Sequence, residues 1–188
     1  MTTFQAPSDA GRSGPPTPRE MNEQMVARLL ATPAEPIPSG GYGLRVLEHH
    51  GRNSGRAHHT PVGVLAMAEH SYLVCPDRTR DWPRNLERKS RCAILGGDRR
   101  DALEALEAAG EEGIDAVSTY LSVVQAPWAL RAFGLPDDPS REQVADAMPR
   151  MVVFRLTAEA VDEPDEADEV VEVASAGPDD ARTTEQEN

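Results

Sequence analysis

Short stretches of alternating apolar and polar residues dominate the middle of the chain. Leu44–His49 alternates in this way, which predicts a strand with one face exposed to water. Thr60–Met67 also alternates, and Ala68–His70 would turn it into Tyr72–Cys75, so these segments predict a β-hairpin. Cys92–Leu95 is a further short apolar strand, ended by a Gly-Gly-Asp turn.

The later part of the chain combines a strand with helices. Met151–Thr157 is apolar on both faces, which predicts a strand in the centre of the sheet. Apolar residues at helical spacing predict helices at Glu20–Ala31 and Ile114–Val124. A short helix capped by its first residue is expected at Asp81–Lys89, and a capping-box pattern at Ser140–Gln143 begins another.

One segment, Arg99–Ala109, allows two interpretations. The spacing of Leu103 and Leu106 suits a helix. A segment that directly follows a Gly-Gly-Asp turn is instead expected to be the returning strand of a hairpin. Periodicity taken alone favours the helix.

Short strands joined by hairpins, with helices as additions, predict a mainly β (α+β) fold built on an antiparallel barrel. A Rossmann sheet would require strands and helices in regular alternation. The folded unit is expected at residues 44–158, after a short helix and a Pro- and Gly-rich loop in residues 20–43. Residues 1–19 and 159–188 lack apolar periodicity and are predicted to be disordered tails.

The charge of the chain is unevenly distributed. The net charge is -13, and the residues from Glu159 onward carry 12 acidic side chains with Arg182 as the only basic one. Between Arg45 and Arg100 there are 11 Lys or Arg against 6 Asp or Glu, together with all five histidines. A basic patch so confined in an acidic protein indicates a small anionic partner rather than a nucleic acid.

Other functional classes are disfavoured by what the sequence lacks. No apolar run reaches the roughly 18 residues of a membrane helix, so no integral membrane segment is expected. The first residues do not resemble a secretory signal. Cys75 and Cys92 form no CxxC motif, which fits a reducing cytoplasm. We therefore expect a cytoplasmic protein, with the oligomeric state left open and a homodimer allowed.

The strongest local motif is the turn Gly51-Arg52-Asn53-Ser54-Gly55-Arg56. Its two glycines allow a tight turn in which backbone amides converge on an anion. Arg52 and Arg56 can each offer a planar fork to a phosphate, and Ser54 adds a hydroxyl donor. The alternative interpretation is an ordinary polar hairpin loop with solvated arginines.

Several other kinds of site do not fit this region. The turn is neither a P-loop nor a nucleophile elbow, because the GK[ST] ending is missing and the serine is not central. The pairs His49-His50 and His58-His59 would point to opposite faces of a strand, so a metal site is not expected. Hydrogen-bonded or solvated histidines are the preferred interpretation.

The second motif is the segment Asp81–Leu86, with the sequence DWPRNL. Trp82 can supply a flat apolar wall, Arg84 an anion donor and Asn85 an orienting hydrogen bond. Taken alone, Trp82 and Leu86 at i and i+4 more simply pin a short helix to the core.

Together, the GRxSGR-type turn, the strand beginning Thr60-Pro61-Val62, the hairpin and the DWxRNL segment resemble the deazaflavin-dependent nitroreductase family. The resemblance covers about Leu44–Leu95 and is looser through Tyr120–Leu156. It implies a split antiparallel β-barrel with flanking helices, coenzyme F420 as cofactor, and a strand after Gly97. We let that implication overrule the helical periodicity of the following segment.

The resemblance also implies the roles of particular residues. Cofactor contacts would come from Arg52, Ser54, Gly55, Arg56, Pro61, Val62, Cys75, Trp82, Arg84 and Asn85. Relatives of this type place several tyrosines near the substrate, whereas here Tyr120 alone occupies the corresponding region, as a candidate proton donor.

The expected function is hydride transfer from reduced deazaflavin to an electron-poor small molecule such as a nitro compound, a quinone or an activated alkene. The cofactor would carry the chemistry, and the protein would orient the reactants. Two alternatives remain open: a non-catalytic carrier of deazaflavin or flavin, and a reductase of the same fold that uses FMN.

Overall fold

The computed structural model describes residues 15–124 and 127–159. Most of the two predicted tails, residues 1–19 and 159–188, therefore lies outside the described residues. The strands are β1 (Tyr42–His50), β2 (Ala57–Met67), β3 (His70–Cys75), β4 (Arg91–Gly96), β5 (Arg99–Glu107) and β6 (Val152–Ala158). The helices are α1 (Pro18–Ala31), α2 (Asp81–Arg88), α3 (Gly110–Val123), α4 (Pro127–Ala132), α5 (Arg141–Ala147) and the 3-10 helix η1 (Met148–Arg150).

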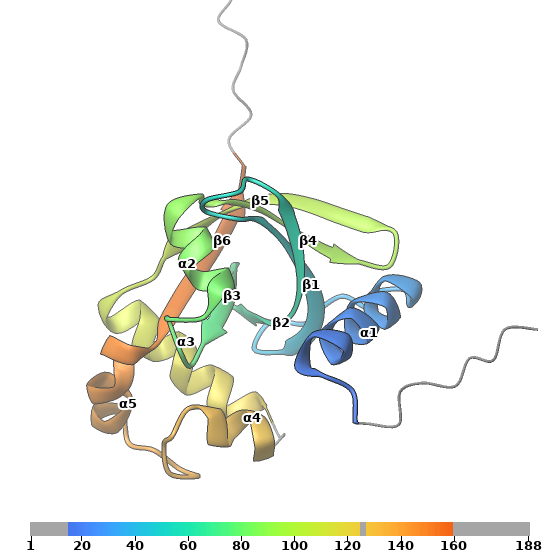
Figure 1. Ribbon diagram of the computed structural model, residues 1–188. Helices are drawn as coiled ribbons and strands as arrows, with labels where there is room; N and C mark the ends of the chain where they lie inside the picture. Colours follow the sequence, from blue (N-terminus) through green and yellow to red (C-terminus); the bar gives the residue numbers. More distant parts are fainter. Residues whose placement is uncertain (1–14, 125–126, 160–188) are drawn as a thin grey trace, which may run out of the picture.

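The strands form one closed barrel in the order β1-β2-β3-β6-β5-β4 (Figure 1). Every neighbouring pair is antiparallel, and the last strand of the ring, β4, pairs back onto β1. Helices flank the barrel on several sides (Figure 1). This confirms the predicted antiparallel β-barrel with flanking helices. Among the described helices, none combines the length and hydrophobicity that a transmembrane span requires.

Alternate residues of the strands build two separate cores. The barrel interior is filled by side chains such as Leu47, Leu73 and Phe154, and α2 adds Trp82 and Leu86 to it. The second core lies on the outer side of β2, β3 and β6, where α3 and α5 pack. Because successive residues of a strand point to opposite faces, β6 contributes to both cores. This explains why both faces of β6 carry apolar residues.

Strand β1 differs from its predicted pattern. Val46 and Leu47 are both fully buried, so the prediction of one face exposed to water was wrong. The face that carries Arg45, Leu47 and His49 points into the barrel, because Leu47 belongs to the interior core. Helix α1 contacts the outer side of β1 and β2. The interior face of β1 therefore reaches from one end of the barrel to the other.

Strand β5 settles the ambiguous segment. The first six residues of Arg99–Glu107 pair with β4 and the last five with β6, so the helix that periodicity favoured is not formed. Leu106, one of the two leucines behind that periodicity, is exposed. The strand implied by the family resemblance is confirmed.

Two helix starts also differ from the sequence interpretation. Helix α1 begins two residues before the predicted boundary, because Thr17 and Glu20 form a capping box with Pro18 in the first turn. In α2 the N-cap position is Arg80, and Asp81 is the first helical residue rather than the cap. The capping box predicted at Ser140 is confirmed, with its hydroxyl accepting from the Gln143 amide.

Candidate functional site

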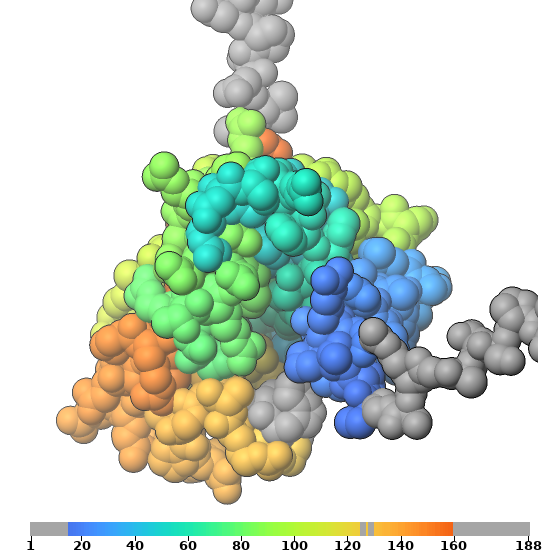
Figure 2. Space-filling view, viewed as in Figure 1, coloured from blue at the N-terminus to red at the C-terminus, as the bar shows by residue number. Residues whose placement is uncertain are grey.

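A groove of about 1190 Å³ lies where the β1–β2 hairpin, α2 and α1 come together. In the space-filling view the surface is hollowed between the blue N-terminal helix and the teal and green segments (Figure 2). Strands β1 and β2 contribute His49, His58 and Thr60, and α2 contributes Trp82 and Asn85. The turn that connects β1 with β2 forms the rim.

That turn is fixed by its own hydrogen bonds. The Gly51 amide donates to the Arg56 carbonyl, and the Gly55 amide donates to the Gly51 carbonyl, both at 2.8 Å. Gly55 has a φ of +68°, which favours glycine. A Cβ on Gly51 would lie 2.5 Å from the Ser54 hydroxyl and 3.0 Å from His58 Nε2. The turn and the neighbouring histidine therefore have no room for a side chain at Gly51.

Most backbone amides of the turn already donate hydrogen bonds to acceptors within the protein. Besides the two glycine amides, the Arg52 amide donates to Asn85 Oδ1 at 3.1 Å, and the Arg56 amide donates to the Ser54 hydroxyl at 3.3 Å. Four of the amides expected to form an anion nest are thus already engaged. An anion at this turn would have to be held mainly by side chains.

Arg52 is the side chain best placed for that task. Its Nη1 donates to Asn85 Oδ1 at 3.0 Å and to Asp81 Oδ1 at 3.2 Å, and its side chain is 29% exposed. Within residues 15–124 and 127–159, its Nη2 and Nε make no hydrogen bond. One edge of the guanidinium is therefore anchored to α2, while the other edge can meet a ligand.

Asn85 joins the two sequence motifs and fixes the state of a buried histidine. Its Oδ1 accepts both Arg52 bonds, so its Nδ2 is the donor toward His49 Nδ1 at 3.2 Å. His49 Nδ1 must then accept, and the imidazole proton must reside on Nε2. That proton points to the Thr60 hydroxyl oxygen, 3.1 Å away. A continuous chain of hydrogen bonds thus runs from Arg52 to Thr60.

His49 is neutral at physiological pH. It is 2% exposed, and its burial, with a smaller effect of the nearby His58, His50 and His59, lowers its pKa to about 4. Its ring stacks on that of His58 at a centroid distance of 5.6 Å. The groove therefore contains a neutral imidazole, with both ring nitrogens hydrogen-bonded, beside the cationic Arg52.

Trp82 both packs in the interior core and lines the groove. Its indole is largely buried and packs against Phe154 of the barrel interior, with ring centroids 6.1 Å apart. Trp82 and Leu86 both lie in the interior core, as the simpler interpretation of their spacing expected. Trp82 also lines the groove, where its ring provides an apolar wall.

The structure brings some of the expected cofactor-binding residues together and separates others. Arg52, Ser54, Trp82 and Asn85 line the groove. The remaining residues, which are not among the lining side chains, are Gly55, Arg56, Pro61, Val62, Cys75 and Arg84. Arg56 and Arg84 are exposed. Cys75 is buried in the barrel interior, where burial raises the pKa of its thiol to about 11.

Tyr120 lies away from the groove. It sits in the outer core, with its ring 5.5 Å from that of Tyr42 and 5.4 Å from that of Phe133. Burial raises the pKa of its phenol well above the ordinary value. Tyr120 is not among the residues that line the groove.

Sequence reasoning missed His49, Thr60 and the contribution of α1. The alternation within β1 was the signal for His49, because it lies two positions from the buried Leu47 and must share its face. Helix α1 lines one side of the groove with residues including Arg19 and Glu23, which pair with each other at 2.8 Å. Within the described residues, no three His, Cys, Asp or Glu side chains are placed to bind one metal ion.

The sequence matches no protein-family model and, at a significant level, no curated protein. Similar solved structures include an F420-H2-dependent reductase, FDR-A, with 14% identity, a TM-score of 0.40, and coverage of 66% of this chain and 100% of the other. A protein of unknown function from Agrobacterium tumefaciens has 18% identity and a TM-score of 0.46. The match covers 78% of this chain and 58% of the other. The general stress protein 26 of Bacillus anthracis has 16% identity and a TM-score of 0.38. The match covers 72% of this chain and 87% of the other. At such values these structures assign neither coenzyme nor substrate to this chain.

Proposed function

We propose that the groove binds a deazaflavin coenzyme of the F420 type and that the protein is an oxidoreductase. Its acceptor would be an electron-poor small molecule such as a nitro compound, a quinone or an activated alkene. The observation that carries the proposal is Asn85, which joins the glycine–arginine turn to α2 across 33 positions of sequence. The two motifs behind the family resemblance thereby form one site.

The donor set of the groove fits a coenzyme that carries a negative tail and a flat ring. The open edge of Arg52 and the Ser54 hydroxyl would bind a phosphate or carboxylate. Trp82 would bound the apolar ring system on one side. A volume of about 1190 Å³ accommodates a ligand larger than a single nucleotide base.

When bound, a reduced deazaflavin supplies the hydride. The residues of the chain would hold the reactants in place, limit access of water and supply a proton. The neutral His49 donates from Nε2 to the Thr60 oxygen, so the Thr60 hydroxyl proton is directed elsewhere and can point into the groove. We therefore place the proton donor at a water molecule that the Thr60 hydroxyl would orient, rather than at Tyr120.

A non-catalytic carrier of deazaflavin or flavin is the second candidate. The side chains that line the groove include no tyrosine, whereas a reductase of this type is expected to use tyrosines near its substrate. A reductase that uses FMN would share the fold and the anion-binding turn. Both alternatives predict coenzyme binding, and they differ in which coenzyme binds and whether turnover follows.

The test is a binding titration of the purified protein with F420 and with FMN. The matched variants are Arg52→Ala and Arg56→Ala, which remove the same charge from the two ends of one turn. Loss of a charge-assisted contact in Arg52→Ala should weaken F420 binding about tenfold or more. Arg56→Ala should change it less than about threefold, because Arg56 does not line the groove.

Absorbance of the reduced coenzyme, followed with a nitroaromatic or a quinone, then separates the enzyme from the carrier. Acceptor-dependent oxidation supports the reductase, and tight binding without turnover supports the carrier. Equal effects of the two arginine variants, or no binding of either coenzyme, would contradict the proposed site.

A further inference from the structure

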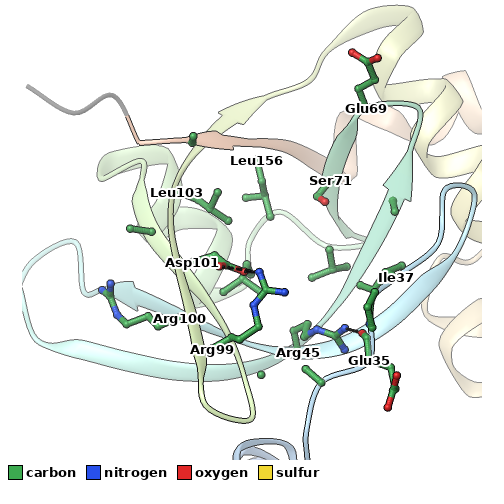
Figure 3. A pocket seen from close by; sticks show the side chains of 18 residues that line it. Glu35, Ile37, Arg45, Glu69, Ser71, Arg99, Arg100, Asp101, Leu103 and Leu156 are labelled. Atoms are coloured by element: carbon green, nitrogen blue, oxygen red, sulfur yellow. Dashed lines mark hydrogen bonds and ion pairs between the residues drawn. The ribbon is translucent and has the colours of Figure 1, made fainter.

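A second cavity, of about 740 Å³, lies at the end of the barrel opposite to His49. Figure 3 shows Arg45, Arg99 and Asp101 near its centre, with Leu103 farther along β5 and Leu156 on β6. Nothing in the proposed coenzyme site uses these residues. The cavity is therefore a separate feature that calls for its own explanation.

Strand β1 shows that the two sites are distinct. Arg45, Leu47 and His49 follow one another on its interior face, with Arg45 at this cavity and His49 at the groove. At about 3.4 Å per residue, the two ends are about 14 Å apart along the strand. Leu47, which is fully buried, belongs to the interior core between them.

The floor of the cavity is apolar. Val64, Ile94 and Leu156 line it and also belong to the interior core, so an entering molecule would contact the upper layer of the barrel filling. Ser71 lies on the wall as an additional hydroxyl (Figure 3). Such a floor favours a ligand with an apolar body.

The charges at the mouth favour a negative group. Arg45 donates from Nη1 to the Leu44 carbonyl at 2.8 Å and from Nη2 to the Glu35 carbonyl. In the part of the chain that the structure describes, no carboxylate lies within ion-pair distance of Arg45, whereas Arg99 pairs with Asp101 at 3.2 Å. The three central charges therefore sum to about +1.

The other charged lining residues, Glu35, Glu69 and Arg100, bring the formal sum to zero, but their charged groups lie away from the centre. The Glu35 and Glu69 carboxylates point away from the centre (Figure 3). Arg100 also points away, and it pairs with Glu48 of the outer barrel face at 2.7 Å.

The position of Arg45 is supported by a close approach of the chain at Gly96. A Cβ there would lie 2.6 Å from that of Ala34 and 3.0 Å from Cδ of Arg45. Glycine thus lets the segment after α1 and the stem of Arg45 pack together at the rim. The guanidinium is held at the edge of the apolar floor.

We infer that this end of the barrel binds a compact carboxylate with an aromatic or alicyclic body. Its apolar body would cover the floor formed by Val64, Ile94 and Leu156. Its carboxylate would bind to Arg45, which donates to backbone carbonyls and pairs with no carboxylate of the described residues. The inference is independent of the coenzyme proposal and uses none of its residues.

The experiment is calorimetric titration of the full-length protein with 2-naphthoate. Benzoate tests the apolar floor, and 2-naphthalenemethanol tests the charge. We expect 2-naphthoate to bind at least about tenfold more tightly than either, because a charge-assisted hydrogen bond and an additional ring each contribute at this level. Equal affinity for the acid and the alcohol would overturn the inference.

Two matched variants locate the site. Arg45→Gln should weaken 2-naphthoate binding about tenfold or more, whereas Arg100→Gln at the outer face should leave it within about twofold. Arg45→Gln should also leave F420 affinity unchanged, so this test and that of the coenzyme proposal fail separately. Binding that survives Arg45→Gln but is lost in Arg52→Gln would place the acid in the groove and overturn the inference.

Discussion

The two ends of the barrel carry the same kind of residue, an arginine beside an apolar core, in different surroundings. At the groove, Arg52 is tied to Asn85 and Asp81, and the bonds continue through His49 to Thr60. At the other end, the hydrogen bonds of Arg45 to described residues all go to backbone carbonyls. One cation belongs to a side-chain network, and the other stands at the edge of an open cavity.

This difference separates two ways of preparing a binding site. In a network, each polar group fixes the orientation of the next, so removing one member leaves buried partners unsatisfied. When a cation is held by main-chain carbonyls, its removal leaves no buried side chain without a hydrogen-bond partner. Substitutions at the groove should therefore affect both stability and binding, whereas those at the opposite end should affect binding alone.

The largest effect should come from pH acting on His49. Its folded-state pKa of about 4 lies below the ordinary value of 6.5. The unfolded chain therefore takes up a proton first as the pH falls through this window. The contribution of the neutral His49 to the free energy of unfolding is fully present above pH 6.5. It falls by about 3 kcal/mol as the pH drops toward 4.

Urea unfolding of the wild type and of His49→Gln at pH 7 and pH 4 measures this effect. The wild type should lose about 3 kcal/mol more than the variant over that range. Arg45→Gln serves as control and should follow the wild-type profile. Parallel profiles for wild type and His49→Gln would show that the imidazole is not held neutral.

A smaller effect is expected from Asn85→Ala. The substitution leaves His49 Nδ1 without its donor and removes an acceptor from Arg52, so the free energy of unfolding should fall by about 2 kcal/mol at pH 7. Chemical denaturation measures it. In Asn85→Asp the carboxylate can still accept from Arg52 but favours a protonated His49. The pH-dependent loss described above should therefore shrink in this variant.

The smallest effect is expected from Arg45→Gln. Because its partners are carbonyls near the surface, the free energy of unfolding should change by less than about 1 kcal/mol. The same measurement on Arg52→Gln should show the larger loss of the two. The reverse order would remove the distinction between the two ends.

The sequence predicted the barrel better than it predicted one of its strands. Hairpins such as that of β2 and β3 rest on local turns and alternation, which a short window reveals. Strand β5 is held by β4 and, at its end, by residues of β6 that follow about 50 positions later. The Gly-Gly-Asp turn predicted the hairpin with β4, but the spacing of Leu103 and Leu106 pointed to a helix, and no local pattern records the distant pairing with β6. The family resemblance supplied the correct interpretation.

The candidate site could be predicted in part. Arg52, Ser54, Trp82 and Asn85 were expected to act together and line one groove. Arg56 was expected beside them because its position in the motif mirrors Arg52, but which rim residue faces the groove depends on how the turn packs against α2. The sequence did not distinguish His49 from the other histidines of the two pairs, because its burial depends on the closure of the whole barrel.

The closed order of the six strands has a consequence for encounters with other chains. Each strand has a neighbour on both sides over part of its length, but residues 57–63 of β2 pair with β1 and not with β3. A foreign strand could add only at such a stretch, because elsewhere the main chain is already paired on both sides. The closed order thereby limits edge-to-edge growth into fibres, even where apolar side chains such as Leu44 and Leu106 reach the surface.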